Sequence, residues 1–159
     1  MNFADTNWLE ALYFEAKERE REARCATVAR FMRKEGGSLG ISHVVYLEAR
    51  NVFSRNARES EPEEWRQLLS DLGGRLYLDP MNWDLLRRDT FALFGKYSPR
   101  LAIGTLDMAI IASAKLSGAT RLLSFDETLK TVATAERIPV FPALTDVGRT
   151  LLSQLRQAS

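Results

Sequence analysis

Four acidic residues occupy positions where a carboxylate could take part in chemistry. Asp5 follows the short apolar run NFA, and Asp126 follows RLLSF, so each comes directly after a candidate strand. Glu48 and Asp107 lie inside helical patterns, in HVVYLEARNVF and LDMAIIASA, on or beside the apolar face. A charge on such a face is costly unless it is paired, protonated or bound to a metal ion. These four acids are therefore the first candidates for a functional site.

Each acid also has an explanation that involves no function. Asp is a favoured N-cap residue, so Asp5 and Asp126 could simply cap the helices that follow them. Glu48 and Asp107 could lie at a helix margin, where they would reach water or a distant basic partner. No local partner is evident for these two, because Arg50 and Lys115 fall on other parts of their helices.

If the four carboxylates met in space, they would form an oxygen-rich, negatively charged cavity. Mg²⁺ and Mn²⁺ prefer that ligand set, and both ions commonly meet phosphate oxygens. A phosphate ester is then the natural substrate, with water as the attacking group. Competing machinery is missing from the sequence, which has no glycine-rich phosphate loop and no zinc-ligand spacing. The single histidine, His43, and the single cysteine, Cys25, exclude a histidine-rich site and an internal disulfide.

The elements that must position these acids alternate between strand and helix. Such alternation predicts a parallel sheet flanked by helices, in a single-domain three-layer α/β/α sandwich with a short, mainly parallel sheet. Functional sites of open parallel sheets lie beyond the carboxyl ends of the strands, where Asp5 and Asp126 are expected. The patterns predict strands at residues 2–5, 75–79, 121–125 and 138–141, and helices at 8–35 (one or two), 42–55, 63–72, 83–97, 105–116, 127–136 and 146–155.

Length and composition indicate an ordinary globular protein. The chain has 159 residues, of which 45% are hydrophobic and 27% charged, so we expect one domain over residues 1–159. A net charge of +1 does not favour a polyanionic partner for the molecule as a whole, although a local basic surface remains possible. No apolar run reaches membrane-spanning length and no signal pattern opens the chain, which predicts a cytoplasmic protein without a membrane partner.

Charged residues fill the segment from Lys17 to Arg24. Glu15 with Arg19, and Glu20 with Arg24, are spaced for favourable pairs on a helix surface. We interpret this run as a solvated helical face.

Three stretches of the chain resemble the signature regions of PIN domains, which are small metal-dependent nucleases. They are FADTNWLEAL, SHVVYLEARNVF and TLDMAIIASAKLSGATRLLSFDETL, and their order and spacing extend the resemblance over essentially the whole chain. VapC-type toxins of type II toxin–antitoxin pairs are the commonest single-domain form of this family. The resemblance implies an endoribonuclease that uses Mg²⁺ or Mn²⁺ to hydrolyse RNA and leaves 5′-phosphate and 3′-hydroxyl ends. It also implies a homodimer and a cognate antitoxin protein.

The same resemblance assigns Asp5, Glu48, Asp107 and Asp126 to the acidic metal centre. Asp5 and Asp126 would be the most direct ligands. Asn7 and Ser124 match polar positions that support the carboxylates, although turn or capping hydrogen bonds explain them equally well.

Other functions remain open at this point. A non-catalytic PIN-like module that binds RNA or a protein would keep the fold without cleavage. A receiver domain would need an adjacent pair of acids after the first strand. A haloacid-dehalogenase phosphatase would need a second aspartate near Asp5. The sequence FADTNW has neither. The RNA target, whether tRNA, rRNA or mRNA, is not readable from the sequence. Candidate phosphate contacts are Arg50, Arg55, Arg58, Arg100, Lys115 and Arg121.

Overall fold

Five short parallel strands form the centre of the molecule in the computed structural model, which describes residues 1–157. They lie in the order β3-β2-β1-β4-β5, and every pairing between neighbours is parallel. The chain therefore builds outward from β1 on one side and returns to β4 on the other, which places the switch in strand order between β1 and β4. The strands are β1 Asn2–Ala4, β2 Leu39–Ile41, β3 Leu76–Leu78, β4 Leu122–Leu123 and β5 Val140–Phe141.

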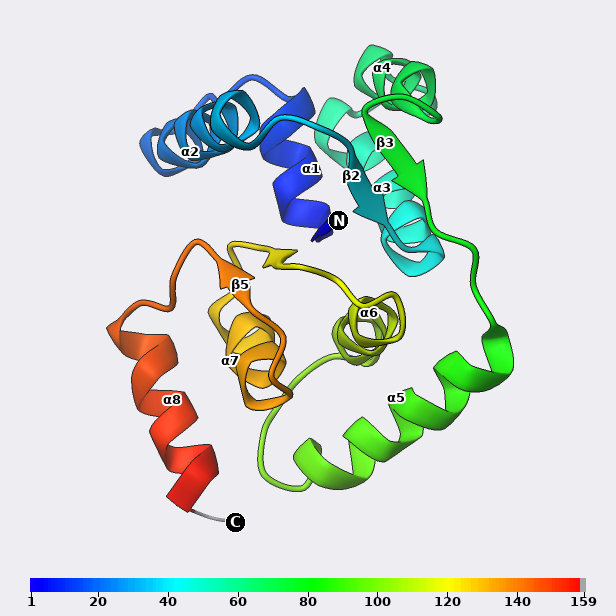
Figure 1. Ribbon diagram of the computed structural model, residues 1–159. Helices are drawn as coiled ribbons and strands as arrows, with labels where there is room; N and C mark the ends of the chain where they lie inside the picture. Colours follow the sequence, from blue (N-terminus) through cyan, green and yellow to red (C-terminus); the bar gives the residue numbers. More distant parts are fainter. Residues whose placement is uncertain (158–159) are drawn as a thin grey trace.

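Two groups of helices cover the sheet, as the sequence predicts for an α/β/α sandwich (Figure 1). None of the helices in residues 1–157 is long and apolar enough to cross a membrane. The first group is α1 Thr6–Tyr13, α2 Arg19–Glu35, α3 His43–Ala57 and α4 Glu63–Asp71, and the second is α5 Trp83–Tyr97, α6 Thr105–Leu116, α7 Glu127–Ala135 and α8 Asp146–Gln157.

Two local predictions need correction. The charged run was expected to pair Glu15 with Arg19, but α2 begins only at Arg19 and no ion pair joins these residues in the described chain. The strand β2 was not predicted, because it is three residues long and has Gly40 at its centre. Gly40 has a packing reason: a Cβ there would lie 2.6 Å from the ring of Phe3 on the neighbouring strand. Gly40 makes β2 hard to recognise from the sequence, but the absence of a side chain there allows β2 to pair with β1.

Aromatic packing ties the first helix to the end of the fourth strand. Trp8, on α1, is completely buried, and its ring stacks on Phe125 with centroids 5.5 Å apart. Phe125 immediately precedes Asp126, and Trp8 lies three residues after Asp5. This contact therefore holds the two segments that follow β1 and β4 against each other.

Glu136, just after α7, joins three helices of the second group. Its carboxylate accepts hydrogen bonds from Lys96 Nζ (2.7 Å) and from the Tyr97 hydroxyl on α5, and from Lys115 Nζ (2.9 Å) on α6. Burial alone would raise the pKa of Glu136, but these hydrogen bonds and the charge of Lys115 lower it to about 2. The cluster fixes α6, which carries Asp107, against the helix that follows Asp126.

We predict that Glu136→Gln lowers the free energy of unfolding by about 2 kcal/mol at neutral pH, since it weakens several charge-assisted hydrogen bonds. The folded-state pKa of about 2 lies below the ordinary 4.5, so this stabilisation is present above pH 4.5 and is lost as pH falls towards 2. Urea unfolding at several pH values would measure the difference. Glu61→Gln, at an exposed position, is the matched control, and equal effects of the two variants would contradict the prediction.

Candidate functional site

Asp5 and Asp126 lie at the carboxyl ends of two paired strands, β1 and β4. Each is the N-cap of the helix that follows, as the local explanation predicts. Asp5 Oδ1 accepts from the Thr6 amide at 2.7 Å, and Asp126 Oδ1 accepts from the Leu129 amide at 3.0 Å. Capping uses only one oxygen of each carboxylate, Oδ1.

Ser124 and Asn7 connect the two aspartates. The Ser124 hydroxyl donates to Asp5 Oδ2 at 2.6 Å and accepts from the Asp126 amide at 3.0 Å. Asn7 Oδ1 accepts from the Phe125 amide at 3.0 Å, and its amide nitrogen lies 3.4 Å from the Ser124 hydroxyl. Ser124 is completely buried, so its single hydroxyl hydrogen is directed by these contacts rather than by water.

Glu48 and Asp107 come from the helices α3 and α6, which contact each other. The Ser42 hydroxyl caps α3 by accepting from the Val45 amide at 3.1 Å, which sets the start of the helix that carries Glu48. Asp107 lies in the first turn of α6, where the helix dipole favours a negative charge. Both side chains are half-buried. They therefore lie at the margins of their helices, which is one of the two explanations that the sequence offered.

Burial and neighbouring negative charges raise the pKa of two of the four acids. Burial raises the pKa of Asp5 to about 7; the charges of Glu48 and Asp107 add to this rise, while the hydrogen bonds from Ser124 and Thr6 oppose it. Burial likewise raises the pKa of Asp107 to about 6, with further contributions from Asp126 and Glu48. All four acids thus belong to one set of mutually repelling charges.

The donor set suits a hard divalent cation. No ion pair joins any of the four acids to a lysine or arginine in the described chain. Buried, coupled carboxylates without a basic partner are the oxygen ligands that Mg²⁺ and Mn²⁺ prefer. Within residues 1–157, however, no three acidic, histidine or cysteine side chains lie close enough to form a ready-made metal-binding group. Binding an ion would therefore require these side chains to draw closer.

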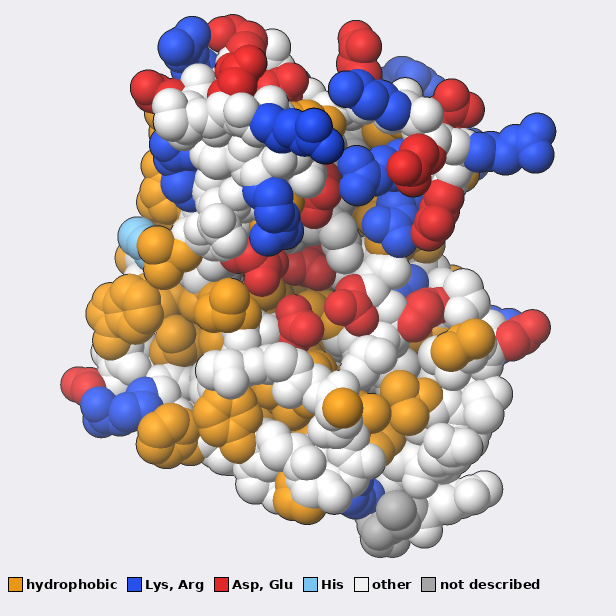
Figure 2. Space-filling model, turned by 180° about the vertical axis from the view of Figure 1, so that it is seen from behind, with side chains coloured by type: hydrophobic (Ala, Val, Ile, Leu, Met, Phe, Trp, Pro, Cys, Tyr) orange, Lys and Arg blue, Asp and Glu red, His pale blue; other side chains and the backbone are white. Residues whose placement is uncertain are grey.

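One face of the molecule combines acidic and basic side chains around a hollow. Figure 2 shows acidic side chains gathered at the middle of one face, with basic side chains bordering the hollow above them. A pocket of about 420 Å³, open solvent at its mouth included, lies between α1, α2 and α3 and is reached past Asn7. We call it the α1–α2 pocket; its polar lining is Asn7, Glu10, Glu15, Arg21, Arg24 and Asn56.

The start of α2 is a solvated face, as predicted: of residues 17–24 only Arg24 is half-buried. The α1–α2 pocket that this face borders was not predicted. A signal was present in the spacing: Arg21, Arg24, Val28 and Phe31 recur every three or four residues, and Val28 and Phe31 are core residues.

A family model for the PIN domain matches residues 3–135 of the chain. The chain belongs to the PIN domain family. This match spans all four acids and confirms the resemblance stated from the three signature stretches. No curated protein matches the chain by sequence.

Several solved structures share this PIN fold at low sequence identity. VapC20 of Mycobacterium tuberculosis, described as a toxin that cleaves the sarcin–ricin loop, is 15% identical with a TM-score of 0.66, over 83% of this chain and 95% of that one. A toxin–antitoxin complex from Klebsiella pneumoniae is 17% identical with a TM-score of 0.56, over 79% of this chain and 87% of that one. VapBC2 of Rickettsia felis, bound to a DNA fragment from its promoter, is 15% identical with a TM-score of 0.57, over 87% of this chain and 96% of that one. At these identities the likeness establishes the fold.

We predict that Asp5→Asn stabilises the metal-free protein at pH 8. The folded-state pKa of about 7 exceeds the ordinary 3.8, so ionisation of Asp5 costs the folded state stability increasingly as pH rises from 3.8 through 7. Asparagine removes the charge and remains a good N-cap. We expect a gain of about 2 kcal/mol, given about 1.4 kcal/mol per unit of pKa and some lost hydrogen bonding.

Urea unfolding in EDTA at pH 8 and pH 4 would test this prediction. The gain should be absent at pH 4, where Asp5 of the folded wild type is neutral and mainly the lost hydrogen bonding separates the two proteins. A variant that is less stable than the wild type at pH 8 would show that Asp5 is a structural acid.

Proposed function

We propose that this protein is an Mg²⁺- or Mn²⁺-dependent endoribonuclease that hydrolyses RNA phosphodiester bonds. The proposal rests on membership of the PIN family and on the charge interactions that link Asp5, Glu48, Asp107 and Asp126, which come from four separate parts of the chain. The full burial of Asp5 and the mutual repulsion of the four acids do not favour stability, because an unpaired buried charge destabilises the folded state.

In this proposal the four carboxylates would hold one or two divalent ions. A bound ion would activate water and offset negative charge on the phosphoryl group. Water oxygen would bond to phosphorus while the bond to the 3′ oxygen breaks; that oxygen takes a proton, leaving 3′-hydroxyl and 5′-phosphate ends. Asp5 is oriented for its role by the Ser124 hydroxyl and the Thr6 amide, and Asp126 by the Leu129 amide.

We further propose that the protein is the toxin of a type II toxin–antitoxin pair. Support comes from the fold shared with VapC20 and with a toxin–antitoxin complex from Klebsiella pneumoniae. An antitoxin segment would then occupy the acidic cleft and block access of RNA. Loss of growth on expression, relieved by a protein encoded beside it, would be the cellular sign.

A homodimer is the proposed assembly. Large apolar side chains are exposed on one side of the molecule: Leu47 on α3, Trp83 and Phe91 on α5, and Leu106 on α6 are 47–65% exposed. Figure 2 shows hydrophobic side chains gathered on that side, over α5 and the adjoining end of α3. Exposed apolar patches of this kind often mark interfaces between proteins.

We predict that the double variant Trp83→Ser, Phe91→Ser is monomeric at micromolar concentration, whereas the wild type sediments as a dimer. Loss of two large aromatic anchors commonly removes the greater part of an interface's affinity. Sedimentation equilibrium measures the mass directly. Equal masses for wild type and variant would remove this surface from consideration.

Cleavage of RNA by the purified protein should require Mg²⁺ or Mn²⁺ and stop in EDTA. Asp5→Asn and Asp126→Asn should each lower kcat/KM by at least about 100-fold, since changes to groups that merely support metal ligands already cost 10- to 100-fold. Total RNA and a sarcin–ricin hairpin are suitable substrates, with cleavage followed on denaturing gels.

Asp84→Asn is the matched control, because Asp84 is an exposed acid on α5 that pairs only with Arg87. It should cleave like the wild type. Wild-type activity in both Asp5→Asn and Asp126→Asn would refute the mechanism. RNA binding without any cleavage by the wild type would instead identify a non-catalytic PIN module.

A further inference from the structure

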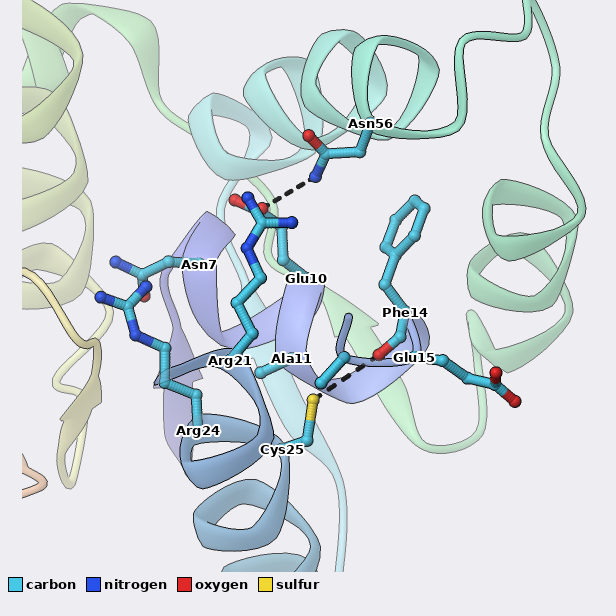
Figure 3. Close-up of a pocket in the computed structure, with 10 residues that line it drawn as sticks. Asn7, Glu10, Ala11, Phe14, Glu15, Arg21, Arg24, Cys25 and Asn56 are labelled. Atoms are coloured by element: carbon cyan, nitrogen blue, oxygen red, sulfur yellow. Dashed lines mark hydrogen bonds between the residues drawn. The ribbon is translucent and has the colours of Figure 1, made fainter. Parts of the chain in front are cut away.

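The α1–α2 pocket adjoins the acidic centre through two shared residues. Asn7 lines the pocket and also accepts a hydrogen bond from the Phe125 amide, next to Asp126. Arg24 lines the pocket with its guanidinium 5.2 Å from the centre of the Phe125 ring. Figure 3 shows Arg24 directed towards Asn7, and Arg21 reaching from α2 towards Glu10 and Asn56. Asn7 thus connects the pocket to the segment that carries Asp126.

The position of Arg21 is unfavourable for helix stability. It lies in the first turn of α2, where the helix dipole disfavours a positive charge. Arg21 and Arg24 also continue the stripe that Val28 and Phe31 bury further along α2; Arg24 is half-buried, whereas Arg21 is exposed where it lines the pocket. A residue that breaks a local rule without a compensating contact is a candidate for function.

Neither guanidinium is held by a strong partner. Within residues 1–157 Arg21 forms no hydrogen bond or ion pair. Arg24 pairs at 3.2 Å with Glu20, whose side chain is 80% exposed. Exposed pairs four residues apart contribute only about 0.3–0.5 kcal/mol. Both cations are thus available to an anionic ligand.

Four of the basic residues suggested from the sequence as phosphate contacts are committed elsewhere. Arg50 donates to Ser54 and Ser60, and Arg100 to the carbonyls of Lys96 and Leu155. Lys115 pairs with Glu136 at 2.9 Å, and Arg121 pairs with Glu35 at 3.0 Å. Releasing any of these four would break an existing contact, which is not so for Arg21.

The two acids of the pocket leave room for an anion. Glu15 is exposed and extends away from the guanidinium groups in Figure 3. Glu10 accepts a hydrogen bond from Asn56 at 2.8 Å. Its carboxylate is well suited to accept from a ribose hydroxyl, a group that distinguishes RNA from DNA.

We propose that Arg21 and Arg24 bind the backbone phosphate next to the scissile bond, and that the α1–α2 pocket receives the nucleotide carrying it. This inference rests on the proposed ribonuclease function and names the binding side of the same site. The repelling carboxylates by themselves would reject a polyanion, so a strand crossing them needs cations at the rim. Arg21 and Arg24 are the residues that supply this charge.

The test compares Arg21→Gln, Arg24→Gln with a second double variant, Arg30→Gln, Arg33→Gln. Arg30 and Arg33 lie on the exposed side of the same helix, so both variants lose the same charge. Steady-state cleavage of a single-stranded oligoribonucleotide in Mg²⁺ gives KM and kcat. We expect the first variant to raise KM about tenfold with little change in kcat. The plot of log KM against log salt should lose about 0.7 of its slope, for one phosphate contact on a single strand.

The control variant should retain the wild-type KM and salt slope. Equal behaviour of the two double variants, with the wild type active, would overturn this proposal and leave the nuclease function intact. A fall in kcat with unchanged KM would also overturn it, since it would give the arginines no part in substrate binding. A wild type that neither cleaves nor binds RNA would refute the proposed function itself, and with it this inference.

Discussion

Mutual repulsion of four carboxylates at one edge of a small sheet is the constraint on which the rest of the structure depends. The repulsion is overcome by parts of the fold that carry no charge. Parallel pairing of β1 with β4 brings Asp5 and Asp126 to the same edge, and the Trp8–Phe125 stack holds the segments that follow them. Contact between α3 and α6 supplies Glu48 and Asp107 from either side. Hydrophobic packing thus provides the free energy that keeps like charges together.

The same chain contains a carboxylate in the opposite situation. Glu136 is surrounded by Lys96, Tyr97 and Lys115, and its pKa falls to about 2, whereas the pKa of Asp5 rises to about 7. One acid is satisfied within the protein and strengthens the packing of α5, α6 and α7. The other lacks a basic partner and lowers stability when ionised. Glu136 is therefore a structural acid, whereas the raised pKa of Asp5 is typical of an acid in a functional site.

Much of the fold was predictable because apolar residues recur at regular spacing and because proline or glycine follows many of the helices. The helices at 83–97 and 105–116 have the predicted bounds, because Pro99 and Gly118 mark their ends and core residues recur at helical spacing. The four acids were found as charges on apolar faces or after strands. The strand around Gly40 was not predictable, since only Phe3, on another strand, explains that glycine. The direction in which the Arg24 side chain points depends on how α2 packs on α1. That packing involves two separate helices, so the local sequence around Arg24 could not predict it.

The two N-caps at the site have a consequence for comparing relatives of this protein. Asp5 and Asp126 each begin a helix, a role worth about 0.5–2 kcal/mol that does not depend on catalysis. A descendant that had lost its activity would still gain from keeping them. Asp107, in the first turn of α6, gains a smaller stabilisation from the helix dipole. Glu48 lies in the middle of α3 and pairs with no lysine or arginine in residues 1–157, so neither contribution would preserve it once the chemistry was gone. Glu48 is therefore the better record of whether a related chain remains an enzyme.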